Sequence, residues 1–244
     1  MRINIPDWLR ELRMAASVGR PAVKFAADGS FGVHTHQGFA VFGKSVNLNH
    51  EIAFADIEDV IKNLKCISNI QVNVEITNGT LSIGDGDNIY YCLLAPSELV
   101  ENYKHEDLQN VYSNDWLDVT VQIEKLYDLA KTIKATKSNV VWFFADNGRL
   151  VAIDGTPGNL WKVNLGIGFM PRPFLITAQK LLQVLNVLDV SRVFISFKFS
   201  SPSILRIKLS DSLGGNVVWY LTERLDRSGW QTYQQQRLLL PHQG

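Results

Sequence analysis

The 244-residue sequence predicts an α+β protein that contains two similar domains in tandem. Hydrophobic residues make up 46% of the chain, which is enough for two cores of ordinary size. Helical apolar spacing alternates with the period-two spacing of strands, and the pattern of the first half returns in the second. Strands outnumber short helices, so we expect each domain to pack two helices on antiparallel sheets.

The clearest repeat joins residues 52–99 to residues 174–225. The apolar stripe of a helix appears in both copies, as Ile57, Val60, Ile61 and Leu64 and again as Leu181, Val184, Leu185 and Leu188. A period-two strand follows in each, with Ile70, Val72, Val74 and Ile76 against Val193, Ile195, Phe197 and Phe199. Each copy then has a second strand, a Gly-rich turn (84–88 or 212–216) and a third strand ending in an aromatic pair. The simplest explanation is a duplicated domain.

The segments before these two copies repeat more weakly. Leu9 and Leu12 match Leu126 and Leu129, and residues 25–28 match residues 143–146 ahead of a turn. Helices are therefore expected near residues 7–17, 55–66, 122–137 and 177–188. The predicted limits are 1–95 for the first domain, 96–117 for a connecting segment, 118–225 for the second domain and 226–244 for a C-terminal tail.

The charges are balanced overall but unevenly distributed. Lys and Arg number 24, as do Asp and Glu, which argues against binding nucleic acid by bulk positive charge alone. Residues 1–118 carry 9 basic and 16 acidic side chains, whereas residues 119–244 carry 15 and 8. Much of the acidic excess lies in residues 96–118, which we interpret as an acidic linker.

These motifs resemble the DNA sliding clamps, the processivity factors that include the bacterial beta clamp and proliferating cell nuclear antigen. The most similar stretch is Phe174 to Leu225, with L-L-x-V-L-x-x-L, V-x-I-x-F, S-x-L-x-I and V-x-Y-L ahead of E-R-L. The resemblance implies a DNA-clamp fold and a DNA polymerase accessory role in DNA replication. It also implies six domains per ring, so a two-domain chain closes as a homotrimer. In such clamps the subunit contact extends a sheet through exposed edge strands.

A clamp that slides cannot read base edges, because each base contact would trap it at one sequence. Helices with outward Lys and Arg that meet phosphates through water satisfy this requirement. The helix spanning 122–137 is the strongest candidate. The predicted DNA-facing residues are Arg10, Arg13, Lys62, Lys65, Lys125, Lys131, Lys134, Lys137 and Lys180. Ordinary solvated helix faces are the alternative interpretation.

The resemblance also implies a hydrophobic pocket beside the connecting segment, where short peptide motifs of the DNA polymerase and clamp loader bind. Its residues in this sequence would be Phe39, Val41, Leu99, Val100, Tyr103, Leu108, Val111, Tyr112, Pro202 and Tyr220. Alternatively, the apolar linker residues fix the linker to its own sheet. The tail resembles the peptides that clamps bind, so Gln236, Leu238 and Leu240 could fill the pocket as a gate; the other possibility is a tail packed along the sheet.

No catalytic motif supports an enzyme. The His34/His36 pair lacks further ligands at metal spacing, and residues 84–88 favour a hairpin turn over a calcium loop. We expect no cofactor and no metal. Cys66 and Cys92 lie in apolar stretches typical of reduced core thiols.

The N-terminal residues lack a signal-peptide pattern and no apolar run suits a bilayer, so a cytoplasmic protein without a membrane partner is expected. The tail and the weakly basic helices favour a viral clamp, located in the host-cell cytoplasm. The alternative function is a monomeric processivity factor with the same duplicated fold that grips double-stranded DNA by a basic face.

Overall fold

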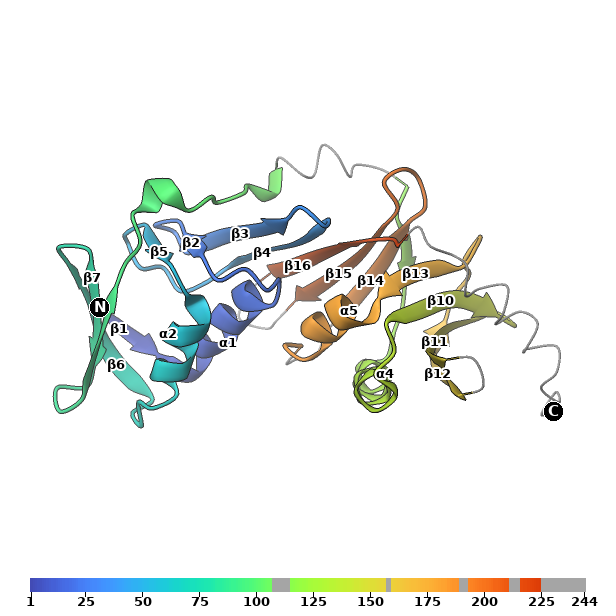
Figure 1. Cartoon of the computed structure of the whole chain (residues 1–244), viewed down its shortest axis with the longest axis horizontal. Coiled ribbons are helices and arrows are strands. Elements are labelled where there is room, and N and C mark those ends of the chain that lie inside the picture. Colours follow the sequence, from blue (N-terminus) through green and yellow to red (C-terminus); the bar gives the residue numbers. More distant parts are fainter. Residues whose placement is uncertain (107–114, 157–158, 189–192, 211–215, 225–244) are drawn as a thin grey trace. The chain divides into compact units, whose positions relative to one another are not determined.

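The computed structural model describes residues 1–106, 115–156, 159–188, 193–210 and 216–224 (Figure 1). The chain divides into two compact units. The first unit comprises Met1–Asn114 and Lys208–Trp219, and the second comprises Asp115–Ile207 and Tyr220–Gly244. Residues 208–219, which the sequence assigns to the second domain, group with the first unit.

The first unit contains two consecutive strand–helix–strand–strand–strand modules. Its elements are β1 (Arg2–Asn4), α1 (Ile5–Ala16), β2 (Val23–Phe25), β3 (Ser30–Thr35), β4 (Phe39–Lys44), β5 (Ile52–Phe54), α2 (Ile57–Leu64), β6 (Gln71–Thr77), β7 (Thr80–Gly84) and β8 (Ile89–Leu93), followed by the short 3₁₀ helix η1 (Ser97–Leu99). Its strands pair in the orders β1-β6-β7-β8 and β5-β2-β3-β4. Each module thus lends its first strand to the sheet of the other, which ties the two modules into one unit.

The second half of the chain repeats the same order of elements. They are β9 (Leu117–Val119), α4 (Ile123–Thr136), β10 (Val140–Asp146), β11 (Arg149–Thr156), β12 (Asn159–Ile167), β13 (Phe174–Thr177), α5 (Ala178–Leu185), β14 (Val193–Lys198), β15 (Ile204–Ser210) and β16 (Asn216–Thr222). Its strands pair as β12-β11-β10-β13 and β16-β15-β14-β9. The described residues therefore hold the five-element module four times, which confirms the predicted α+β fold of two similar domains.

Capping hydrogen bonds fix where α1 and α2 begin. Helix α1 starts at Ile5, two residues before the predicted limit, because the Asn4 side chain accepts a hydrogen bond from the Asp7 N–H at 3.1 Å. Pro6 in the first turn costs no hydrogen bond. Helix α2 is capped by Asp56, which accepts from the N–H groups of Glu58 and Asp59.

The helices pack in pairs by their apolar faces. In the first unit α1 contacts α2, as Figure 1 shows, and Trp8, Leu12, Ile57 and Leu64 are buried. In the second unit α4 contacts α5, and Phe143, Phe174 and Phe197 form an aromatic core with ring centroids 5.3–5.5 Å apart. Each pair leaves its polar face outside the core.

The two cysteines have different environments. Cys92 is buried in β8, as expected, but the expectation for Cys66 was wrong. Cys66 is exposed and lies beyond the end of α2 at Leu64, so it is not on the buried stripe of that helix.

Candidate functional site

The outward face of α4 carries the most exposed cluster of predicted DNA-facing residues. Leu126, Leu129 and Ile133 bury one face of the helix, while Lys131 and Lys134 are exposed on the other. Lys137, in the left-handed conformation at φ 52°, ends the helix and is also exposed. Among the described residues these three lysines form no ion pair, so their charge is available to an anionic ligand.

Lys125 differs from the other lysines of α4. Its ammonium group lies 3.6 Å from the Asp128 carboxylate, one turn along the helix. An exposed pair of this kind contributes little stability but cancels local charge. The positive charge of α4 is therefore concentrated at its C-terminal half, where it also faces the negative end of the helix dipole.

The remaining predicted residues are spread over three helices. Arg13 on α1, Lys62 on α2 and Lys65 just after α2 are exposed, but Glu58 and Asp59 on α2 are exposed too. Arg10 on α1 is half-buried. Lys180 on α5 is also half-buried, and this burial lowers the pKa of its ammonium group. These helices offer weaker positive surfaces than α4.

Two edge strands expose apolar side chains. Strand β8 ends one sheet of the first unit, and its alternate residues Ile89, Tyr91 and Leu93 are exposed, Leu93 by 78%. Strand β12 ends one sheet of the second unit and exposes Trp161 and Ile167. An uncovered edge with apolar side chains is a surface suited to pairing with another chain. The sequence predicted a strand ending at Tyr91 but did not mark either strand as an edge, although the period-two spacing of residues 89, 91 and 93 was a signal.

The connecting segment brings three predicted pocket residues together. Leu99, Val100 and Tyr103 line a hollow of about 220 Å³ with Arg20, Ala22 and Val33, all in the first unit. Leu99 is 75% exposed, whereas Val100 is buried. Arg20 and Glu101 give the hollow a charged edge, and their side chains form an ion pair at 3.9 Å.

The same segment is fixed to its own sheet. The Gly32 N–H donates to Asn102 Oδ1 at 2.9 Å, and the Tyr103 N–H donates to the Gly32 carbonyl at 3.2 Å. A Cβ at position 32 would overlap the Tyr103 carbonyl oxygen, so only glycine permits this approach. Tyr103 also contacts the His34 ring. The linker residues thus have the packing role that was the alternative interpretation, and Leu99 still remains exposed.

Several predicted pocket residues are not available at a surface. Phe39 and Val41 are buried in β4 and Tyr220 is buried in β16, so the expectation that their side chains line an open pocket needs correction. Residues 39–42 are all apolar and all buried, and an apolar stretch of this kind can belong to a core or to a binding site, which explains the error. Pro202 is exposed. Leu108, Val111 and Tyr112, like the tail residues Gln236, Leu238 and Leu240, lie outside the described residues.

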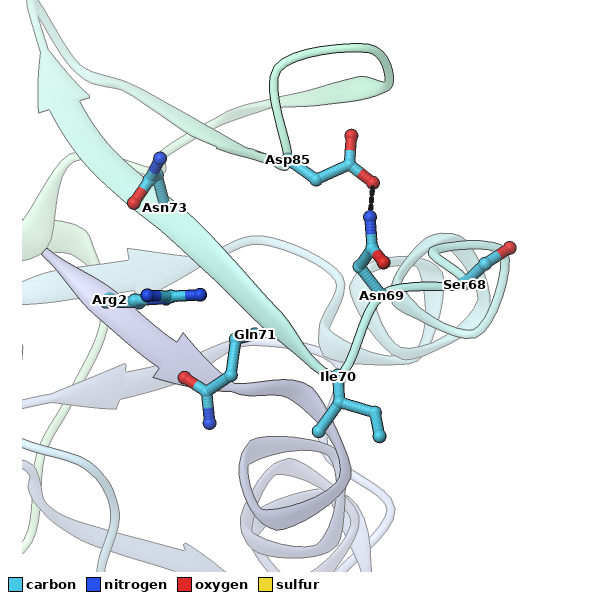
Figure 2. A pocket seen from close by; sticks show the side chains of 7 residues that line it. All are labelled: Arg2, Ser68, Asn69, Ile70, Gln71, Asn73 and Asp85. Carbon is cyan, nitrogen blue, oxygen red and sulfur yellow. Dashed lines mark hydrogen bonds between the residues drawn. The ribbon is translucent and has the colours of Figure 1, made fainter.

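A second hollow, of about 740 Å³, lies beside β1 and β6 (Figure 2). Its lining is mostly polar, with Arg2, Gln71 and Asn73 on the strands, and the Asn69 amide donates to the Asp85 carboxylate. Asp85 also accepts from the N–H groups of Asp87 and Asn88, and these bonds form the predicted hairpin turn. A polar, open hollow does not suit an apolar peptide anchor.

The metal-ligating side chains of the described residues are not clustered. No group of three His, Cys, Asp or Glu side chains in this part of the chain could hold a metal ion. His34 is half-buried on β3, and burial lowers its pKa. Among the described residues, no helix combines the length and the apolar character needed to cross a bilayer.

The fold of this chain matches solved structures, whereas comparison of its sequence with known families and proteins finds no match. No family model and no curated protein matches the chain. PCNA from Thermococcus kodakaraensis superposes with a TM-score of 0.67 at 17% identity, over 91% of this chain and 98% of that one. The PCNA2-PCNA3 complex from Sulfolobus tokodaii gives 0.67 at 11% identity, over 93% and 100%.

The bacterial type of clamp is similar as well. The beta subunit of DNA polymerase III from Thermotoga maritima gives a TM-score of 0.66 at 13% identity, over 94% of this chain and 66% of that chain. A further structure, of A. fulgidus PCNA with the C-terminal region of FEN-1 bound, gives a TM-score of 0.66 at 13% identity. The match covers 93% of this chain and 98% of that chain. These likenesses show that the chain has the sliding-clamp fold.

Proposed function

We propose that this protein is a sliding clamp, a non-enzymatic processivity factor that encircles duplex DNA in the cytoplasm and tethers replication proteins to it. The observation that carries the proposal is the fourfold module in the clamp fold, together with the unpaired lysines on the outward face of α4. A positive helix face in this fold suits a scaffold that holds DNA through its phosphates.

The DNA contact is proposed to be weak and independent of sequence. The exposed side chains of Lys131, Lys134 and Lys137 are long and flexible. Their ammonium groups can reach phosphates but lack the fixed geometry that reads bases. A zero net charge also keeps the whole molecule from binding DNA tightly at one position. Mobility along the duplex follows from such contacts.

Retention is proposed to come from a closed homotrimer. Strands β8 and β12 are unlike edges, one on each unit, and a head-to-tail contact between unlike surfaces closes three copies into a ring. The exposed side chains of Tyr91, Leu93, Trp161 and Ile167 would then be buried between subunits. The hollow at Leu99, Val100 and Tyr103 is proposed to take an apolar side chain from a polymerase or loader peptide.

The first experiment measures the molar mass by light scattering. A ring predicts three times the chain mass of 27.5 kDa at micromolar concentration. A stable monomer would instead favour the alternative, a processivity factor that grips DNA with one chain.

The second experiment tests the DNA-facing surface by the salt dependence of binding to a DNA duplex. The triple variant Lys131→Ala/Lys134→Ala/Lys137→Ala should reduce the slope of log K against log salt by up to about 0.9 for each lysine that neutralises a phosphate. The control Lys44→Ala/Lys104→Ala/Lys208→Ala removes the same charge from exposed positions off the helices and should leave the slope unchanged. Equal effects of both variants would contradict a DNA-facing role for α4.

A further inference from the structure

One sheet of the second unit is apolar on both faces. Along β10, Phe143 contacts the core residue Phe197, and its neighbours Trp142 and Phe144 point to the opposite face. Residues paired across neighbouring strands point to the same face of a sheet. Trp142 pairs with both Ile153 and Leu175, and Phe144 pairs with Val151, so these residues share one face. We call the surface formed by Trp142, Phe144, Val151, Ile153 and Leu175 the Trp142 face.

The Trp142 face is shielded from solvent. Trp142 is only 6% exposed and Leu175 only 1%, and Val140 and Leu160 pack around them. At one end of this face Asp146 forms an ion pair with Lys162 at 2.6 Å, which gives the apolar cluster a charged border. Five large apolar side chains on a second face need a cover, because leaving them in water would cost about 25 cal/mol per Å².

After β16, the chain reaches the edge of the Trp142 face. After β16, the Glu223 N–H donates to the Ser203 carbonyl and the Arg224 N–H donates to the Leu175 carbonyl, at 2.8 and 2.9 Å. Arg172 holds this point with two hydrogen bonds to the Glu223 carboxylate. Arg224, the last described residue of the chain, therefore lies beside β13, an edge strand that contributes Leu175 to the Trp142 face.

The first unit contains the same arrangement with its cover in place. After β8, the Leu94 N–H donates to the Gly79 carbonyl and the Ala95 N–H donates to the Ala53 carbonyl of β5. These two bonds correspond to those of Glu223 and Arg224, since β5 and β13 occupy equivalent places in the two units. The chain then lies against β3 and β4, where Tyr103 bonds to Gly32 and the His105 ring contacts Phe42.

We propose that residues 225–244 cover the Trp142 face of their own chain, as residues 96–105 cover the equivalent sheet of the first unit. The segment carries apolar side chains at Leu225, Trp230, Tyr233 and 238–240, which suit an apolar surface. An extended chain advances about 3.3 Å per residue and strands lie about 4.8 Å apart, so this segment is long enough to cross four strands. The tail is then a part of the second unit rather than a gate for the partner hollow.

Hydrogen exchange followed by mass spectrometry tests the proposal on the full chain. In the variant Leu238→Asp/Leu239→Asp/Leu240→Asp, amides of β10 and β13 should exchange about tenfold faster or more, because charged side chains cannot stay on the Trp142 face. The control Gln234→Asp/Gln235→Asp/Gln236→Asp adds the same charge to the same segment and should exchange like the wild type. Amides of β14 serve as the internal reference and should not change.

Two further measurements separate the other occupants. A chain truncated after Arg224 should recover slow exchange of β10 amides when a synthetic peptide of residues 225–244 is added. Unchanged exchange of β10 and β13 in both the aspartate variant and the truncated chain would overturn the proposal. So would protection of the full chain that is lost on about hundredfold dilution, since that result would assign the cover to a second copy.

Discussion

At the scale of single residues, the buried indole of Trp219 has a specific hydrogen-bond partner. The Trp219 indole N–H donates to Ser17 Oγ at 2.9 Å inside the first unit, and Ser17 Oγ in turn donates to the Met14 carbonyl. Trp219 is completely buried, so its N–H has no access to water. Ser17 is also the C-cap residue of α1, so it both ends the helix and contacts the core.

Replacing Ser17 tests this contact. Ser17→Ala leaves the Trp219 N–H without its acceptor and should lower the free energy of unfolding by about 1–3 kcal/mol. Urea denaturation followed by circular dichroism gives the value. Ser68→Ala, at an exposed serine, should change the stability by less than about 0.5 kcal/mol. A Ser17→Ala protein as stable as this control would show that the hydrogen bond contributes nothing.

Glu11 makes the stability depend on pH. Its carboxylate accepts from Ser45 Oγ and from the Val46 N–H, but burial outweighs these bonds and raises the pKa above the ordinary value of 4.5. The native state therefore binds the proton more tightly than the unfolded state does. The stability from this proton is present at pH 4 and is lost as the pH rises through the raised pKa.

The variant Glu11→Gln removes this titration while keeping an oxygen acceptor. Relative to the wild type, its unfolding free energy should therefore improve between pH 4 and pH 7. Urea denaturation at the two pH values measures the change, and Glu75→Gln, at an exposed carboxylate, is the control. A wild type that loses no more stability than Glu11→Gln over this interval would contradict the assignment.

At the scale of elements, caps decide where the helices begin. Asp56 bonds two N–H groups at the start of α2, whereas Gln122 before α4 makes no such bond among the described residues. Asp56→Ala should cost about 1 kcal/mol of stability, measured by thermal or urea unfolding, and Asp56→Asn should retain most of it. Equal losses in both variants would indicate that charge near the helix dipole, rather than the capping bond, is responsible.

The elements were largely predictable because burial imposes a period on the sequence. Ile57, Val60, Ile61 and Leu64 form one stripe, and they all lie on the buried face of α2. The start of α1 was missed, because an Asn–Ile–Pro sequence reads as an extended segment until the Asn4 cap is seen. The position of Cys66 was also missed, since the apolar residues Leu64 and Ile67 near it do not tell where the helix stops.

The residues of the candidate site were less predictable than the elements. Phe39 and Val41 belong to a run of four apolar residues, and an apolar run alone does not tell a core from a binding surface. By contrast, the lysines of α4 follow from helical spacing, because a buried stripe at Leu126, Leu129 and Ile133 fixes which side chains point outward. Their role toward DNA stays a prediction.

At the scale of the whole molecule, the edge strands are the features that link one chain to an assembly. Tyr91→Lys/Leu93→Lys places charges on β8, and we expect light scattering to show the trimer mass fall toward that of the single chain. Ile70→Lys, at an exposed apolar residue just before β6, is the control and should retain the trimer. A Tyr91→Lys/Leu93→Lys protein that keeps the trimer mass would place the subunit contact elsewhere.

The unequal environments of the two thiols have a practical consequence. Burial raises the pKa of the Cys92 thiol, so at neutral pH a maleimide dye should react with exposed Cys66 and leave Cys92 unmodified. Every chain then carries a single fluorophore at a defined place without any engineered cysteine. The number of photobleaching steps in one diffusing spot would count the chains that travel together along a stretched duplex.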